Sequence, residues 1–324
     1  MQSTIRRVTG VFFGALIISG VVLPAAAAYP ERPIRLIVPF SPNGPNDVLA
    51  RLVGARLTAA WGQQVVIDNR PGAGTIIGTE MMASSQPDGY TLLMISASTA
   101  VNPTLKKKLP YDTRKDVVPL VQLASAPTVL VVHPSVQAKN IAELVALAKA
   151  KPGALTFASG GTGTTTHLAG ELFAITSGIQ WTHVPYKGTG PANIDLLGGR
   201  VSAMFGTILP VLPHIKSGKM RAIGVSSLDR SPVLPDVPAV AETLPGFEAV
   251  SFFGIATPAG VTEPVRNKLN REIARIITAP DMVENLRKQG TKAVGNTQAE
   301  FSAFFNRELA KWAKVIKAAG IEAD

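Results

Sequence analysis

The 324-residue sequence contains no cysteine, which excludes disulfide bonds, thiolate catalysis and cysteine-ligated metal sites. Its four histidines (His133, His167, His183 and His214) lack the spacing of metal ligands. Walker A, His-Glu-x-x-His and Gly-x-Ser-x-Gly motifs are also absent from the sequence. We therefore expect no metal, no cofactor and no catalytic residue.

Long apolar runs are missing as well, since no segment after residue 28 reaches the roughly 18 apolar residues of a transmembrane helix. Residues 1–28 have the pattern of a cleaved signal peptide. Arg6 and Arg7 precede the apolar run Val11 to Leu23, and Ala26 to Ala28 supply small residues at the cleavage site. That run rises only about 20 Å as a helix, too short for a membrane anchor. We predict export to the periplasm, with Tyr29 as the first mature residue.

Acidic residues are fewer than basic ones. Without residues 1–28 the chain has 30 basic and 22 acidic side chains, a net charge of +8. The basic residues are scattered, with Lys106 to Lys108 as the longest run, and no nucleic-acid-binding motif accompanies them. The charge therefore favours solubility and a mild attraction for anionic solutes, with no nucleic-acid partner.

Short β-rich apolar runs alternate with helical patterns throughout the mature chain. The predicted strands are Ile34–Val38, Val65–Asp68, Thr91–Ile95, Val117–Leu123, Val129–Val132, Leu155–Ala158, Trp181–Val184, Ala203–Phe205, Arg221–Ser226 and Phe252–Thr257. Asn140 with Glu143, and Thr297 with Glu300, resemble capping boxes that open helices. The aromatic stripe after Thr297 has helical spacing, which favours core packing over a partner surface. This alternation predicts an α/β class with largely parallel sheets.

Two long apolar segments, Val117 to Pro134 and Ala249 to Pro258, are placed to cross between two lobes. We predict one lobe from residues 29–126 and 248–324, and a second from residues 127–247. Within them, two strand–loop–helix segments stand out, Pro33 to Arg51 and Ala158 to Leu168. A loop that leads into a helix N-terminus offers free N–H groups and partial positive charge to an anion. Two such loops in opposite lobes would form a clamp for a small carboxylate.

A third polar cluster runs from His183 to Arg200 and contains Tyr186, Lys187 and Asp195. Together these segments supply the candidate ligand-binding residues, to which Ser96 and Phe205 at the ends of predicted strands are added. The candidates are Phe40, Ser41, Asn43, Gly44, Asn46, Asp47, Ser96, Ser159, Gly161, Thr162, Gly163, Thr164, Thr165, His167, Tyr186, Lys187, Asp195 and Phe205. An exported hydrolase that uses Ser159 and His167 stays open as an alternative.

Several motifs together resemble the Bug/TctC family, the periplasmic substrate-binding receptors of tripartite tricarboxylate transporters. They are Tyr29-Pro30, Val38-Pro39-Phe40, Asn69-Arg70-Pro71-Gly72-Ala73-Gly74, Pro87-Asp88-Gly89-Tyr90-Thr91, His183-Val-Pro-Tyr-Lys-Gly188, Leu196-Leu-Gly-Gly199 and Arg230-Ser-Pro-Val-Leu-Pro-Asp-Val-Pro238. The resemblance covers essentially the whole mature chain, in order. The sequence departs from the family pattern at Asn43, where a Gly-Gly pair is usual, and at Asn46, where Thr or Ser is common.

The resemblance implies a two-lobed periplasmic binding protein of the type II-like, Venus-flytrap class, with its ligand in the cleft between the lobes. The ligand would be a small carboxylate: a di- or tricarboxylate, an amino acid or an aromatic acid. Loop N–H groups, hydroxyls and waters would hold it, and the monomeric receptor would deliver it to a tripartite tricarboxylate-type membrane permease. A ligand sensor that signals without transport stays open as a further alternative.

Overall fold

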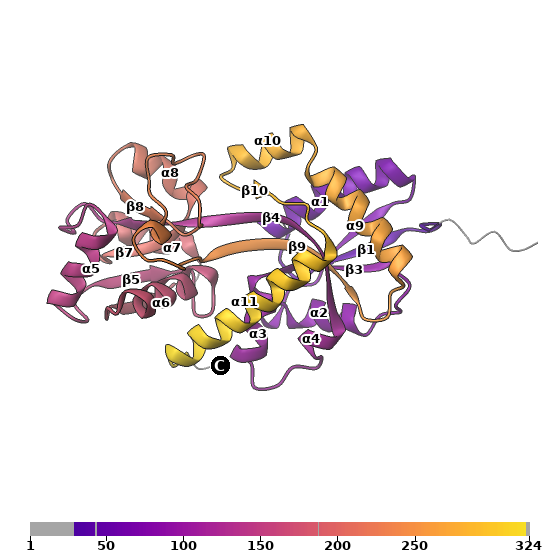
Figure 1. The fold of residues 1–324 in the computed structure, drawn as a ribbon, viewed down its shortest axis with the longest axis horizontal. Coiled ribbons are helices and arrows are strands. Elements are labelled where there is room, and N and C mark those ends of the chain that lie inside the picture. The colour runs from indigo at the N-terminus through magenta and orange to yellow at the C-terminus, as the bar shows by residue number, and fades with distance from the viewer. Residues whose placement is uncertain (1–28, 43, 187, 322–324) are drawn as a thin grey trace, which may run out of the picture.

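The computed structural model describes residues 29–42, 44–186 and 188–321. It has two lobes joined by two long strands, β4 (Val117–Val132) and β9 (Val250–Pro258) (Figure 1). The ten strands of the described residues follow the order β2-β1-β3-β9-β4-β7-β5-β6, with β8 and β10 also pairing with β4. The two-lobed α/β fold is confirmed. The residue boundaries of the lobes stay a prediction.

The first lobe contains five strands besides the first part of β4: β1 (Ile34–Val38), β2 (Val65–Asn69), β3 (Thr91–Ser96), β9 and β10 (Lys292–Ala293). Its helices are α1 (Pro45–Trp61), α2 (Ile76–Ala83), α3 (Ala97–Leu105), α4 (Thr113–Asp116), α9 (Glu263–Ile277), α10 (Pro280–Lys288) and α11 (Gln298–Ala318). A 3₁₀ turn at Ala73–Thr75 precedes α2. Helix α1 begins slightly before the predicted start at Asp47, because Pro45 suits the first helical turn, where no N–H is needed.

The second lobe combines the last part of β4 with β5 (Thr156–Ser159), β6 (Thr182–Pro185), β7 (Ala203–Thr207) and β8 (Arg221–Val225). Its helices are α5 (Ile141–Ala150), α6 (Thr165–Ser177), α7 (Thr189–Leu197) and α8 (Ile208–Lys216), followed by a 3₁₀ turn at Val240–Glu242. The Asn140 side chain accepts a hydrogen bond from the Glu143 N–H, so it caps α5 as the sequence predicts.

The expectation of largely parallel sheets is wrong for the centre of the molecule. Pairing is parallel within β2-β1-β3 and within β7-β5-β6. It is antiparallel wherever β4 or β9 takes part, because one crossing strand leaves the first lobe and the other returns to it. The two strands predicted at Val117–Leu123 and Val129–Val132 are one strand. Pro127, which donates no ladder hydrogen bond, lies where β4 changes its neighbour from β9 to β7.

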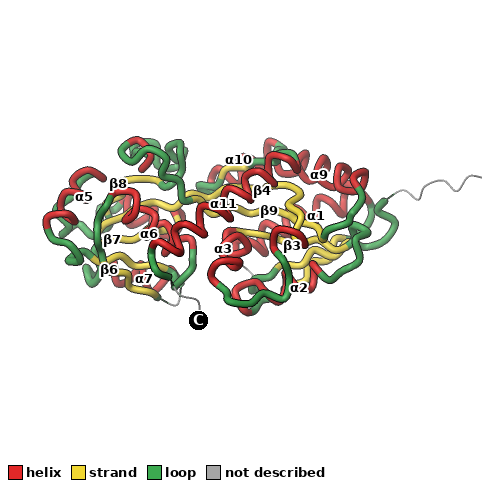
Figure 2. The backbone as a smooth tube through the Cα atoms, turned by 60° about the horizontal axis from the view of Figure 1, so that its bottom comes forward, coloured by secondary structure: helices red, strands yellow, loops and turns green. Residues whose placement is uncertain are grey.

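Helix α11 contacts both lobes. Its N-terminus is a capping box, in which the Thr297 N–H donates to Glu300 Oε2 (2.9 Å) and the Glu300 N–H donates to Thr297 Oγ1 (3.3 Å). The predicted stripe is buried, with Phe301 and Trp312 fully inaccessible. The helix packs on α3 of the first lobe and α6 of the second (Figure 2). The aromatic stripe is therefore core, as its spacing predicts.

Within the described residues, no helix has both the length and the apolar character needed to cross a membrane. The predicted signal peptide, residues 1–28, lies outside the described residues. Its cleavage stays a prediction.

Candidate ligand-binding site

A cavity of about 460 Å³ lies between the lobes, against both crossing strands. The first lobe contributes Phe40, Pro45, Asn46, Ser96, Ala97, Ser98, Gln289, Gly290 and Thr291 to its wall. The crossing strands contribute Ala126, Pro127, Thr128, Ser251, Phe252 and Phe253. The second lobe contributes Thr164, Thr165, Thr207, Ile208, Leu209 and Pro210. The volume falls in the range of small-molecule sites, roughly 300–1,000 Å³.

Four helices begin at this cavity: α1 and α3 from the first lobe, and α6 and α8 from the second. The first N–H groups of a helix have no partner within the helix, and each N-terminus carries about half a positive charge. None of the described residues that line the cavity has a charged side chain. The arrangement therefore suits an anion held by hydrogen bonds and helix dipoles, without a side-chain countercharge.

The cavity wall also has a substantial apolar part. Phe40 and Phe253 belong to the first lobe and its crossing strand, whereas Leu209 and Pro210 belong to the first turn of α8. Hydroxyl groups of Ser98, Thr165 and Thr207 lie among them on the same wall. A small molecule with an anionic end and a carbon skeleton matches such a mixed wall.

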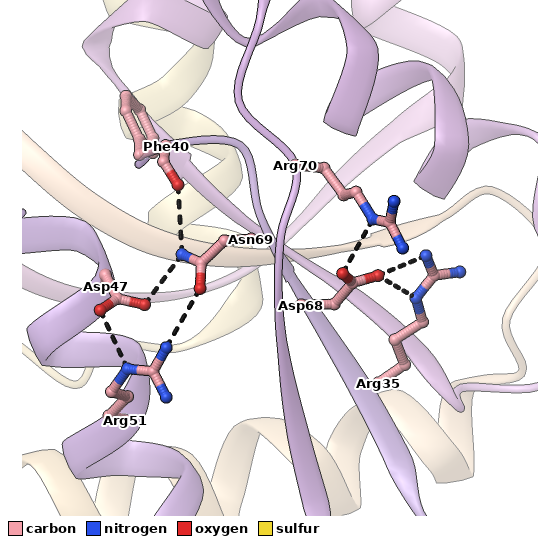
Figure 3. A network of polar contacts seen from close by, with 7 residues as sticks. All are labelled: Arg35, Phe40, Asp47, Arg51, Asp68, Asn69 and Arg70. Atoms are coloured by element: carbon pink, nitrogen blue, oxygen red, sulfur yellow. Dashed lines mark hydrogen bonds and ion pairs between the residues drawn. The ribbon is translucent and has the colours of Figure 1, made fainter. Parts of the chain in front are cut away.

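The loop before α1 is fixed by a network around Asp47 (Figure 3). Asp47 is only 1% exposed. Its carboxylate accepts hydrogen bonds from Asn69 Nδ2 (2.8 Å) and Arg51 Nε (2.9 Å), while the same Asn69 amide donates to the Phe40 carbonyl (3.1 Å). Asp47 does not line the cavity. Instead, the network positions Phe40 and Asn46, which do.

The loop before α6 is organised by its own side chains. Ser159 Oγ accepts from the Gly161 N–H (3.1 Å) and lies 2.7 Å from His183 Nε2. The Thr164 hydroxyl donates to the Gly161 carbonyl (2.7 Å) and caps α6. The polar groups of Ser159 and Gly161 are therefore hydrogen-bonded within the second lobe. Thr164 and Thr165, where α6 begins, form part of the cavity wall.

The structure does not form the predicted Ser159–His167 pair. The Gly163 N–H donates to His167 Nδ1 (3.0 Å), so the ring proton is on Nε2, which lies 3.4 Å from Glu171 Oε1. Ser159 instead contacts His183, whose ring stacks on that of His167 with centroids 3.8 Å apart. Ser159 is fully buried and does not line the cavity.

The stacked histidines give a pH-dependent stability. Burial, with a smaller contribution from His167, lowers the pKa of His183 to about 4. An unfolded histidine titrates near 6.5, so between about pH 6.5 and 4 the unfolded chain binds more protons. The contribution of His183 to the free energy of unfolding is therefore fully present above about pH 6.5. As the pH falls to 5, this free energy decreases by about 1–2 kcal/mol. Chemical unfolding of wild type and His183→Gln at both pH values should show a shallower decline for the variant. An equal decline in both would contradict this assignment.

Three further candidates make contacts away from the cavity. The Tyr186 hydroxyl donates to Asp195 Oδ2 (2.6 Å), and Arg200 donates to the other oxygen of that carboxylate (2.7 Å). Burial, followed by the hydrogen bond to Asp195, raises the pKa of Tyr186 to about 12. Phe205 is fully buried against Phe173 and Phe247. These side chains stabilise the second lobe and do not line the cavity.

The structure thus brings five of the predicted residues to one cavity: Phe40, Asn46, Ser96, Thr164 and Thr165. Asn43 and Lys187 lie outside the described residues. The other described candidates do not line the cavity. They are Ser41, Gly44, Asp47, Ser159, Gly161, Thr162, Gly163, His167, Tyr186, Asp195 and Phe205.

Sequence reasoning missed two parts of the wall. Thr207 ends β7 and Ile208 opens α8, so the strand passes directly into a helix without the polar loop that marks the other two segments. Gln289 to Thr291 connect α10 to β10 and reach the cavity only through the tertiary fold. Gly290, at φ +68°, packs against Ile208 and Val233 of the second lobe, and nothing local predicts that contact.

Comparison with known proteins agrees with this geometry. Residues 49–321 match the family described as the tripartite tricarboxylate transporter family receptor, TctC. The chain is 39% identical to Protein BugT of Bordetella pertussis over an alignment of 323 residues that covers 98% of each protein. The match therefore extends over nearly the full length of both chains.

Solved structures show the same fold. The R. palustris protein Rpa4515 with adipate superimposes with a TM-score of 0.76 at 32% identity and covers 91% of this chain and all of its own. MatC from Rhodopseudomonas palustris with bound malate gives a TM-score of 0.72 at 29% identity, over 89% of this chain and all of its own. Both neighbours were solved with dicarboxylates.

Proposed function

Because the chain belongs to the tripartite tricarboxylate transporter receptor family, we propose that it is a periplasmic receptor for a small carboxylate. The ligand is held between the lobes by helix N-terminal N–H groups, hydroxyls and bridging waters, and is delivered to the membrane subunits of a tripartite tricarboxylate-type transporter. The receptor acts as a monomer and performs no catalysis.

The observation that carries the proposal is the interlobe cavity, at which four helix N-termini meet and whose described lining residues are all uncharged. Hydrogen bonds to a charged group are worth about 1.5–3 kcal/mol each. Three or four of them support a free energy of binding of about −8 kcal/mol, or micromolar affinity, after ordering costs are subtracted. The carboxylates present in the structures of Rpa4515 and MatC support the ligand class.

The positions of Ser159 and His167 argue against the hydrolase alternative. Ser159 is buried away from the cavity, and His167 is engaged by Gly163 and Glu171. An ester substrate bound in the cavity would not meet this hydroxyl, because Ser159 is absent from the described wall. A sensor that signals without transport would bind the ligand in the same way. Only a transport assay therefore distinguishes such a sensor from a receptor that delivers its ligand to a permease.

The test is thermal unfolding in the presence of a panel of carboxylates, with the corresponding amides as uncharged controls. At 100 times its Kd a ligand of the folded state adds about 2.7 kcal/mol of stability. For a chain of this size we expect at least one acid to raise the Tm by about 5 °C or more, and its amide to have no effect. If no acid shifts the Tm, and mass spectrometry of the purified protein finds no retained acid, the proposal is wrong.

A further inference from the structure

Helices α6 and α11 lie side by side and leave a groove of about 470 Å³ between them, separate from the interlobe cavity (Figures 1 and 2). The floor of this α6–α11 groove is apolar, with Leu172 and Ile175 one turn apart on α6 and Ala310, Val315 and Ala318 on α11. Ile175 is 45% exposed, although large aliphatic side chains are mostly buried in folded proteins. An adjoining hollow shares Ile175 and Ala318 and continues the groove past the C-terminus of α6. The described residues therefore leave a continuous apolar strip uncovered.

The rim of the groove is basic. Arg307 and Lys314 are exposed and lie seven positions apart on α11, which is two turns or about 10 Å. Within the described residues neither side chain is in an ion pair or a hydrogen bond. Lys311, between them, is already bound to Glu308 (2.5 Å) and to the Glu248 carbonyl. None of the described residues that line the groove is acidic, so a molecule that complements the rim supplies the carboxylates.

The shape of the groove selects the kind of molecule. Two packed helices with an apolar groove between them accept the apolar face of a third helix. Ala310 and Ala318 are exposed and carry only a methyl group, so the backbone of such a helix can approach α11 closely. The lining residues of α11 extend from Arg307 to Ala318, about 16 Å or three helical turns. An amphipathic helix with acidic residues two turns apart along one flank fits both the floor and the rim.

Both helices of the groove are connected to the ligand-binding cavity. Helix α6 begins there, with Thr164 and Thr165 on the second-lobe wall. Helix α11 packs on α3, which begins on the first-lobe wall at Ser96 and Ala97. A surface built from α6 and α11 therefore suits a partner that recognises the ligand-bound arrangement of the lobes. Building on the proposed function, we propose that the α6–α11 groove docks an acidic amphipathic helix of the membrane subunits of the transporter.

Variants that alter the groove without touching the cavity test this proposal. Ile175→Glu places an acid on the apolar floor, and Arg307→Glu/Lys314→Glu reverses the charge of the rim. Calorimetry should show that both variants bind an acid from the carboxylate panel within about twofold of the wild-type Kd. Uptake of the same radiolabelled acid is then measured in cells of the source organism that lack this gene and express each variant. Uptake should fall at least about tenfold, because both changes lie at the centre of the contact.

Matched controls alter the same kinds of side chain elsewhere on the surface. Ile194→Glu changes an isoleucine of α7 that is 64% exposed and does not line the groove. Lys216→Glu/Lys219→Glu changes the net charge as much as the double variant of the rim, at and just after the end of α8. Both controls should keep uptake within about twofold of wild type. Immunoblots that show equal amounts of periplasmic receptor make the uptake rates comparable.

Uptake at the wild-type level in both groove variants overturns the inference and leaves the carboxylate receptor standing. So does a wild-type dimer in sedimentation that the groove changes dissociate, since the groove would then bind a second copy of the chain. Binding to phosphatidylglycerol vesicles that the same changes abolish would assign the groove to lipid and also overturn it. If the wild-type gene restores uptake of no acid that the protein binds, delivery to a transporter and the inference both fail. If no carboxylate binds at all, the proposed function itself is wrong.

Discussion

Gly163→Val is expected to weaken carboxylate binding at least tenfold, whereas Lys107→Ala changes it less than about twofold. Gly163 has φ +76°, a conformation that a β-branched residue adopts only with strain. A Cβ atom at this position would also lie 2.6 Å from Leu105 Cδ2 of α3, in the opposite lobe. The substitution therefore strains the loop before α6 and forces the Leu105 side chain of the opposite lobe to move. Lys107 is exposed, so its loss removes only surface charge.

Calorimetry with an acid identified in the panel measures this effect, and thermal unfolding shows that each variant is folded. The double variant Gly163→Val/Leu105→Ala separates the two causes, since it removes the contact between lobes and keeps the backbone strain. Partial recovery of affinity in the double variant assigns part of the loss to the contact with Leu105. Equal affinities for Gly163→Val and Lys107→Ala would show that the loop geometry does not govern binding.

Asp47→Ala is expected to lower both stability and affinity. The substitution leaves the half-buried amide of Asn69 and the exposed guanidinium of Arg51 without their carboxylate, and it releases the loop that carries Phe40 (Figure 3). Losing the hydrogen bonds to this buried carboxylate costs about 1.5–3 kcal/mol. Because Asn46 and Phe40 line the cavity, we also expect affinity to fall at least tenfold. Chemical unfolding and calorimetry on the same preparation measure both effects.

Asp68→Ala is the matched control for this prediction. Asp68 lies on β2 and also carries two arginine contacts, to Arg35 and Arg70, but its own side chain is 19% exposed, against 1% for Asp47 (Figure 3). Exposed ion pairs contribute about 1 kcal/mol or less, so the variant should remain close to wild type and bind normally. A loss for Asp68→Ala as large as that for Asp47→Ala would mean that burial is not the deciding factor.

Local patterns predicted the local structure well. The strand Ile34–Val38 and the capping box of Thr297 and Glu300 follow from side chains a few positions apart, and the structure confirms both. The antiparallel centre was not predictable in the same way. Strand β9 pairs with β3 and β4 only after the chain has passed through the whole second lobe. The spacing of residues in the sequence does not indicate such a distant pairing.

For the binding site too, local sequence patterns predicted some residues, whereas contacts between distant residues were not predictable. The pattern of strand, polar loop and helix located Asn46 and Thr164 at the cavity, because that pattern carries its own physical consequence. It did not reveal which polar side chains are already engaged. Asp47 is bound by Asn69, Tyr186 by Asp195, and Ser159 by His183, and each of these partners lies 9 to 24 positions away in the sequence. Such distant partners become visible only in the fold.

The position of β9 between β3 and β4 also sets the order in which the molecule assembles. Leu93 of β3 pairs with Ala256, and Val117 of β4 pairs with Pro258, so the first-lobe sheet closes only across contacts that span the whole second lobe. All the strand pairs of the second lobe lie between Thr128 and Val225. Contacts between residues far apart in sequence form slowly, because a long loop must close first. We therefore expect the second lobe to complete its sheet before the first, and the edge of β3 to stay unpaired until β9 arrives.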